Sequence, residues 1–208
     1  MWSFEKKYVA SDEVDAGPLS EKWLTLVWLA LFGGMVGLLA LHHTLICSFS
    51  DAQALLFVPF ALVFARLAAL DLCYLLLLNI YTVPLFISGI ACHFFLPGMS
   101  GISWQESLLG GLVAAGLGVL LTFVITLFNK QQGEFGFGDV KMLAVMGVWV
   151  GLTALPFALA LGFIANLVLS FFISGRHPMP FGFGLVLGTW VMVAFKQPFM
   201  EMLFYLAT

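Results

Sequence analysis

The feature that most constrains this chain is a set of long apolar runs that no charged residue interrupts. The run from Met142 to Gly175 contains no Asp, Glu, Lys or Arg, and it is too long for a single membrane span of about 20 residues. Only 9% of the 208 residues are charged and 62% are hydrophobic, whereas about a quarter of the residues in a soluble domain are charged. Such a chain cannot cover a water-facing surface, so its solvent must be mostly lipid.

The apolar runs predict an all-α fold, a polytopic transmembrane helix bundle with about seven spans, or six. The run from Met142 to Gly175 would form a hairpin of two spans that turns at Gly151 and Pro156. The runs do not alternate between polar and apolar residues as the strands of a membrane β-barrel do. The other expected spans are Trp23–Leu41, Ala54–Leu70, Ile80–Leu96, Ser107–Phe128 and Phe181–Phe195.

The distribution of lysine and arginine predicts a cytoplasmic N-terminus, because these residues concentrate on the cytoplasmic side of membrane proteins. With seven spans, only Lys196 of the eight basic residues falls towards the outside. The expected external loops, His42–Gln53 and Pro97–Glu106, contain neither lysine nor arginine. Residues 1–22 would then be a cytoplasmic tail without a cleavable signal peptide, and residues 23–208 a membrane-embedded domain.

Two aspartates at membrane depth are the candidate chemical groups. Asp71 ends the second apolar run and Asp139 opens the fifth, so the topology puts both at cytoplasmic helix ends. Two carboxylates that meet in a low-dielectric site share one proton; one can then accept a proton from water while the other donates to a substrate carbonyl, as in aspartic proteases. Structural alternatives carry about equal weight at this point: Asp139 as a helix N-cap, and Asp71 as a helix-end residue or a partner of Arg66.

Four short segments resemble the type IV prepilin peptidases, a family of GxGD aspartic membrane proteases. Residues 136–141 read GFGDVK, like the family's GxGD signature, and residues 147–151 read GVWVG. Residues 179–182 read MPFG and resemble the Pro-Phe-Gly segment that begins the family's last helix. DLCY at residues 71–74, with Asn79 and Pro84, matches the register of its first-aspartate segment. The resemblance covers roughly residues 60–193.

The resemblance implies a multi-pass endopeptidase of the bacterial inner membrane. It would cut the short basic leaders of prepilin or pseudopilin precursors at the cytoplasmic face, for a type IV pilus or a type II secretion system. Asp71 and Asp139 would be the catalytic pair, with no assignment of the base. Gly136 and Gly138 would form an active-site loop that lets the peptide approach closely.

Further polar residues are candidates for substrate or supporting contacts, namely Lys141, Asn79 and Glu134. Each also has a simpler interpretation. A lysine at a helix end ordinarily extends to the membrane interface, an amide in an apolar helix, as at Asn79 or Asn166, ordinarily bridges helices, and a loop carboxylate is ordinarily solvated.

The chain departs from the family in three respects, one of which is that residues 1–55 match none of its motifs. Cys73 and Leu75 replace the usual basic residues after the first aspartate, and Leu78 replaces the usual proline before Asn79. Bifunctional members carry a cytoplasmic insertion with paired CxxC motifs and an N-methylation segment, whereas the three cysteines of this chain form no CxxC pair. A short form is therefore expected, without N-methyltransferase activity, an S-adenosylmethionine site, a metal or another cofactor.

Two other classes of protein stay open from the sequence. A transporter or a pilus or secretion assembly factor would use the aspartates to relay protons or to cap helices. A presenilin-type protease also uses GxGD but cuts within spans, and the Pro-Phe-Gly segment fits the prepilin group better. The expected partners are a prepilin-like precursor and the lipid bilayer, and no nucleic acid; the oligomeric state stays open.

Overall fold

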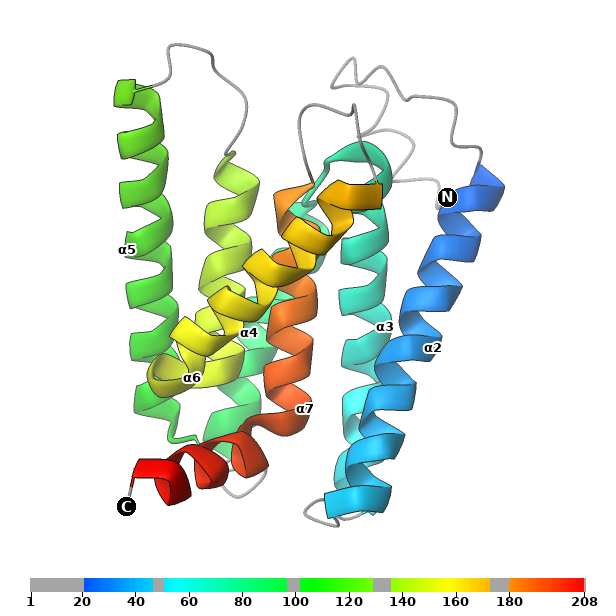
Figure 1. Cartoon of the computed structure of the whole chain (residues 1–208), viewed down its shortest axis with the longest axis vertical. Coiled ribbons are helices and arrows are strands. Elements are labelled where there is room, and N and C mark those ends of the chain that lie inside the picture. Colours follow the sequence, from blue (N-terminus) through cyan, green and yellow to red (C-terminus); the bar gives the residue numbers. More distant parts are fainter. Residues whose placement is uncertain (1–20, 47–50, 97–101, 129–135, 173–179, 208) are drawn as a thin grey trace.

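The protein is described by a computed structural model over residues 21–46, 51–96, 102–128, 136–172 and 180–207 (Figure 1). Within these ranges every regular element is a helix, which confirms the predicted all-α bundle. Most of the predicted tail, residues 1–20, lies outside the described residues. The helices are α2 (Glu21–Ile46), α3 (Asp51–Tyr74), α4 (Asn79–Phe95), α5 (Trp104–Phe128), α6 (Phe137–Phe172) and α7 (Phe181–Ala207).

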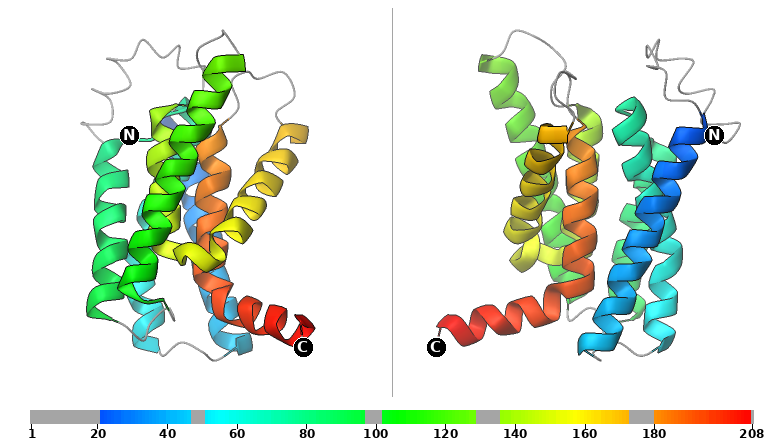
Figure 2. Two further views of the ribbon diagram at one scale, coloured as in Figure 1. Left: turned by 90° about the vertical axis from the view of Figure 1, so that its left-hand side faces the viewer. Right: turned by 45° about the vertical axis from the view of Figure 1, so that its right-hand side comes forward.

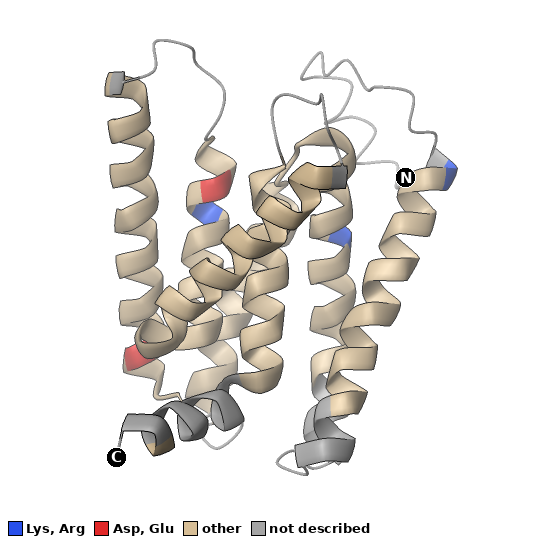
Figure 3. Cartoon of the chain, viewed as in Figure 1, with Lys and Arg blue, Asp and Glu red and all other residues tan. Residues whose placement is uncertain are grey.

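The helices have the length and composition of membrane spans. Helices α2, α3, α5 and α6 are long and apolar enough to cross a bilayer, while α4 and residues 181–195 of α7 form shorter apolar helices. Charged side chains are few along the described helices (Figure 3). Large apolar side chains such as Phe123, Phe163 and Phe171 face outward, as expected where lipid replaces water.

Helix α6 is bent into two arms at Gly151. The glycine has φ 75° and ψ 171°, a left-handed backbone conformation that costs glycine little because it has no Cβ atom. This confirms the predicted hairpin, although Pro156 lies inside the second arm and not at the turn. When the two arms of α6 are counted separately, the described residues form seven apolar helical segments, which is roughly consistent with the expected number of spans. Figure 2 shows the second arm leaning away from the first, and the last turns of α7 running across the bundle.

Side chains from neighbouring helices satisfy the polar groups around this bend. The Val148 carbonyl oxygen accepts hydrogen bonds from His93 Nε2 at 3.1 Å and from Ser107 Oγ at 2.8 Å. On the other side of the bend, Glu106 Oε1 accepts from the Thr153 hydroxyl at 2.6 Å and from its N–H at 3.4 Å. Irregular backbone at membrane depth needs such internal partners, because lipid offers none.

Small residues four apart in α5, at Gly110, Ala114 and Gly118, let this helix approach the first arm of α6 closely. A methyl group added at Gly110 would overlap the Gly147 carbonyl, and one added at Gly147 would overlap the Gly110 carbonyl. A methyl group at Gly118 would lie 3.1 Å from Val140 Cα. These backbones touch without intervening side chains, which strengthens van der Waals packing in lipid.

Two further pairs of glycines four residues apart, in α7 and in α2, behave differently from one another. Gly184 and Gly188 of α7 pack against the second arm of α6, where a methyl group at Gly184 would contact Gly162. Around Gly33 and Gly37 of α2, by contrast, no described atom lies within 4 Å of where a methyl group would stand. No other part of the described structure therefore approaches α2 closely at these two glycines.

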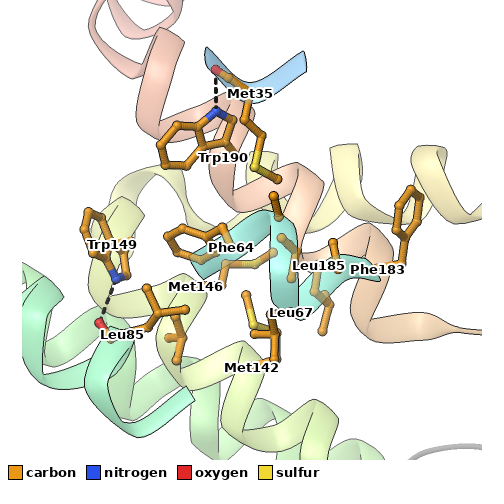
Figure 4. Packing of buried hydrophobic residues seen from close by; sticks show 14 of the residues in the cluster. Met35, Phe64, Leu67, Leu85, Met142, Met146, Trp149, Phe183, Leu185 and Trp190 are labelled. Carbon is orange, nitrogen blue, oxygen red and sulfur yellow. Dashed lines mark hydrogen bonds between the residues drawn. The ribbon is translucent and has the colours of Figure 1, made fainter. Parts of the chain in front are cut away.

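An aromatic cluster holds five helices together (Figure 4). The Phe64 ring of α3 lies with its centroid 5.5 Å from that of Trp149 in α6 and 5.7 Å from that of Trp190 in α7. Trp149 Nε1 donates to the Leu85 carbonyl of α4 at 2.8 Å, and Trp190 Nε1 donates to the Met35 carbonyl of α2 at 3.1 Å. Trp190 does not mark a membrane interface, because its side chain is fully buried.

We predict that Gly110→Ala destabilises the protein by about 1–3 kcal/mol, because the added methyl group forces α5 away from α6. Gly116→Ala on the same helix is the matched control, since nothing lies within 4 Å of the added methyl group there. The control should be neutral, or stabilising by up to about 1 kcal/mol through helix propensity. Thermal unfolding in detergent measures both, and equal melting temperatures would contradict the packing assigned to Gly110.

Candidate active site

The chain brings its two membrane-depth aspartates to the same end of the bundle. The last turn of α3, which carries Asp71, lies at the end where α4, α6 and α7 begin (Figure 1). Asp139 is the third residue of α6. The predicted topology requires this shared depth. Glu134, the loop candidate, lies outside the described residues.

Asp71 is buried and holds the start of α7. Its side chain is 4% exposed, and its Oδ2 accepts the Phe183 N–H at 2.7 Å, with a further backbone hydrogen bond from Gly182. Gly182 and Phe183 are the second and third residues of α7, where backbone N–H groups have no partner within the helix. Asp71 therefore caps α7 from a different helix. Arg66, considered as its partner, lies with its guanidinium 5.5 Å from the centre of the Trp28 ring.

Asp139 closes the first turn of its own helix. Its Oδ2 accepts the Gly136 N–H at 3.0 Å, and the Asp139 N–H donates to the Gly136 carbonyl at 3.0 Å. The bond from the Gly136 N–H to an acidic side chain at the third helical position is one half of a capping box; the other half is absent because glycine has no side chain. The alternative of Asp139 as the N-cap is therefore wrong, since Gly136 precedes the helix and Asp139 lies inside it.

Asp71 and Asp139 lie beside helix starts that meet at one residue, Leu77, and the charge of Asp139 acts on the Asp71 carboxyl group. Leu77, in the segment between α3 and α4, contacts the starts of both α6 and α7. A methyl group at Gly138 would lie 3.1 Å from Leu77 Cβ, and one at Gly182 would lie 2.6 Å from Leu77 Cδ1 and 3.0 Å from Asp71 Oδ2. The glycines thus allow three chain segments to converge on the aspartates.

The segment that follows Asp71 has an unusual backbone. Leu75 adopts φ 56°, a left-handed conformation that is uncommon for a residue with a Cβ atom. Such strained residues cluster at functional sites, where the surrounding structure fixes them. Leu75 stands at a position where the type IV prepilin peptidases, which the sequence resembles, usually have a basic residue.

A polar bridge lies at the same end of the bundle. Lys141 Nζ donates to Asn79 Oδ1 at 2.7 Å and joins the start of α6 to the start of α4. Asn79 thus makes the interhelical contact of its simpler interpretation, whereas Lys141 bonds a neighbouring helix. The roles of both residues toward a substrate stay predictions. Across the described ranges, no three His, Cys, Asp or Glu side chains gather closely enough to hold a metal ion.

The sequence-based interpretation named Asn166 as a bridge between helices but not as a neighbour of this site. Its Nδ2 donates to the Phe181 carbonyl at 3.0 Å, and its Oδ1 accepts the Gly184 N–H at 3.1 Å. Both bonds fall on the turn of α7 that Asp71 caps from the other side. The sequence shows Asn166 as a polar amide in an otherwise apolar run, which is the only sign of its role there. Its hydrogen-bond partners in α7 could not be predicted, because they depend on how α6 folds back at Gly151.

The fold and this site define a polytopic helical membrane protein that joins two carboxylates at one end of its bundle. A family model described as the type IV leader peptidase family matches residues 55–171, a segment that includes both aspartates. The match covers more than half of the 208 residues. The chain belongs to the type IV leader peptidase family.

Three curated relatives, each called prepilin leader peptidase/N-methyltransferase, show the extent of the similarity. The Aeromonas hydrophila protein is 31% identical over 137 residues, which cover 62% of this chain and 45% of that protein. The Dickeya chrysanthemi protein is 27% identical over 135 residues, covering 64% and 45%. The protein of Burkholderia pseudomallei strain 1026b is 26% identical over 179 residues, covering 82% and 53%. The chain spans about half the length of these relatives. No solved structure is significantly similar to it.

We predict that Gly182→Ala destabilises the protein by about 1–3 kcal/mol, because the methyl group would crowd both Leu77 and the Asp71 carboxylate. Gly136→Ala is the control at the other helix start, where the nearest atoms would lie 3.8 and 4.0 Å away. It should cost less than about 1 kcal/mol, since the backbone hydrogen bonds of the cap are kept. Chemical or thermal unfolding in detergent would refute the prediction if Gly136→Ala proved the more damaging change.

Proposed function

We propose that this protein is an aspartic endopeptidase that removes the leader peptide of prepilin or pseudopilin-like precursors. The observation that carries the proposal is that the helix starts bonded by Asp71 and Asp139 meet at Leu77. The two aspartates are far apart in the chain and occupy the first-aspartate and GxGD positions of the family, respectively. The names of the relatives support the substrate class.

The proposed reaction is general acid–base hydrolysis of the peptide bond between leader and mature chain. One carboxylate is ionised and accepts a proton from a water molecule, whose oxygen attacks the scissile carbonyl carbon. The other is protonated and donates to the carbonyl oxygen, as in aspartic proteases. The C–N bond then breaks as the leaving nitrogen gains a proton from the pair. Which aspartate begins as the base is not assigned.

The proposed site faces the cytoplasm. Lys22, Arg66 and Lys141 all lie in the halves of their helices nearest the aspartate end of the bundle (Figure 3). Basic residues concentrate on the cytoplasmic side of membrane proteins, so this end, and with it the N-terminus, belongs in the cytoplasm of a bacterial inner-membrane protein. The proposal covers leader cleavage and leaves methyl transfer out, because the sequence contains no CxxC pair.

We predict that Asp71→Asn and Asp139→Asn each abolish cleavage, with a loss of at least about a thousandfold in kcat, because an amide can neither accept nor share the proton. Both variants should still insert and fold, since an amide oxygen can accept the N–H bonds that each carboxylate accepts. The measurement is a gel-shift assay with purified protein in detergent and a synthetic precursor. Glu106→Gln, which alters the acid at the opposite end of the bundle, should retain cleavage.

Processing by either aspartate variant would overturn the catalytic pair. A transporter or assembly factor would instead give no cleavage by the wild-type protein, together with a transport or assembly defect on deletion.

We also predict that the leader lies at the aspartate end during cleavage. A benzophenone label on a cysteine that replaces Phe137 should cross-link to the leader on illumination. Phe137 is 75% exposed at the start of α6. Trp104, 43% exposed at the start of α5 on the opposite end, is the matched control and should remain unlabelled. Mass spectrometry of the adducts decides, and a leader linked to position 104 would contradict the proposed side of entry.

A further inference from the structure

We infer that Asn166 is a positioning residue for Asp71, acting through the first turn of α7. The inference rests on the proposed function, since it assigns a second residue to the geometry of the same acid pair. Asn166 does not touch the reacting atoms, because its amide bonds the backbone of α7. It fixes the backbone that in turn orients the buried carboxylate.

The amide of Asn166 uses both of its ends on one turn of another helix. The side chain is 9% exposed in the second arm of α6. Its Nδ2 donates to the Phe181 carbonyl at 3.0 Å, and its Oδ1 accepts the Gly184 N–H at 3.1 Å. An amide that bonds an acceptor and a donor three residues apart fixes the rotation of that turn as well as its distance.

Asp71 holds the same turn from α3. Its carboxylate accepts the Phe183 N–H at 2.7 Å and a second bond from Gly182. Four successive residues of α7 are thus held from outside, two by Asn166 and two by Asp71. The first N–H groups of a helix lack helical partners, and glycine at two of the four positions weakens the turn further. The position of the Asp71 carboxylate therefore depends on how firmly Asn166 holds the turn.

Adhesion between the two helices does not require Asn166. The glycines of α7 already pack against the second arm, where a methyl group at Gly188 would overlap the Ala158 carbonyl and lie 2.8 Å from Gly162 N. That contact lies one turn further from the aspartates. What Asn166 adds is the alignment of the turn nearest the site.

The first test is Asn166→Leu, which keeps the volume and removes both hydrogen bonds. A misplacement of about 1 Å costs up to a hundredfold in rate, so we expect kcat to fall about ten- to a hundredfold while KM stays within about twofold. Hydrogen–deuterium exchange of the peptide containing residues 181–184 should accelerate. Ser170→Ala is the control on the same arm, because its hydroxyl bonds only the Leu167 carbonyl of its own helix at 2.6 Å in the described structure, and it should match the wild type.

A second pair of variants decides the question if Asn166→Leu does not fold. A methyl group at Gly184 would lie 2.5 Å from both Asn166 Cγ and Nδ2, so Gly184→Ala displaces the amide. Gly188→Ala crowds the same pair of helices without touching Asn166. At equal folded fractions, Gly184→Ala should lose kcat and Gly188→Ala should not.

The outcomes separate this inference from the proposed function. Cleavage by Asp71→Asn would overturn the proposed function itself. Loss of cleavage in Asp71→Asn with full kcat in folded Asn166→Leu would overturn the positioning role alone. Equal losses in Gly184→Ala and Gly188→Ala would also overturn it, because the effect would then come from general separation of the helices.

Discussion

The structure depends on one interaction above others, the cap that Asp71 of α3 provides for the first turn of α7. A helix start that is buried within the bundle cannot use bulk water for its unpaired N–H groups, so protein groups must satisfy them. A carboxylate suits this position because it accepts two hydrogen bonds and favours the positive end of the helix dipole. The same bond brings the buried acid beside the start of α6, where Asp139 caps its own first turn. The carboxylate oxygens that bond these helix starts therefore belong to the same two side chains for which the chemistry is proposed.

At the opposite end of the bundle, where no chemistry is proposed, protein side chains also satisfy the backbone groups that have no helical partner. There the chain reverses at Gly151, and the groups exposed by the bend are bonded by His93, Ser107 and Glu106 from α4 and α5. The bend lets α6 present Asp139 on one arm and Asn166 on the other, so both arms reach the site from different sides. The glycine contacts with α5 and α7 hold these arms in place.

Much of this arrangement was predictable because it depends on local properties. Apolar runs predicted the spans, Gly151 predicted the hairpin turn, and the depth of Asp71 and Asp139 predicted that they share one end. The partners of particular side chains were not predictable. Trp190 is buried because α2 and α3 pack against it, and Gly33 and Gly37 stay open because no described helix approaches that face. Asn166 and Leu77 reach the site only through the packing of segments distant in sequence, and no pattern of period 3.6 encodes such packing.

The convergence of segments also gives a physical reason for the Phe-Gly step at residues 181–182. Gly182 donates to Asp71 from a position where a Cβ atom would stand 3.0 Å from the carboxylate oxygen and 2.6 Å from Leu77. Gly138 of the GxGD segment is restricted by Leu77 in the same way. The GxGD and Pro-Phe-Gly motifs look independent in the sequence, but the Leu77 side chain restricts a glycine of each. A larger residue at either glycine would push its helix start away from Leu77, and since each helix start is bonded to one aspartate, the distance between the two acids would change with it.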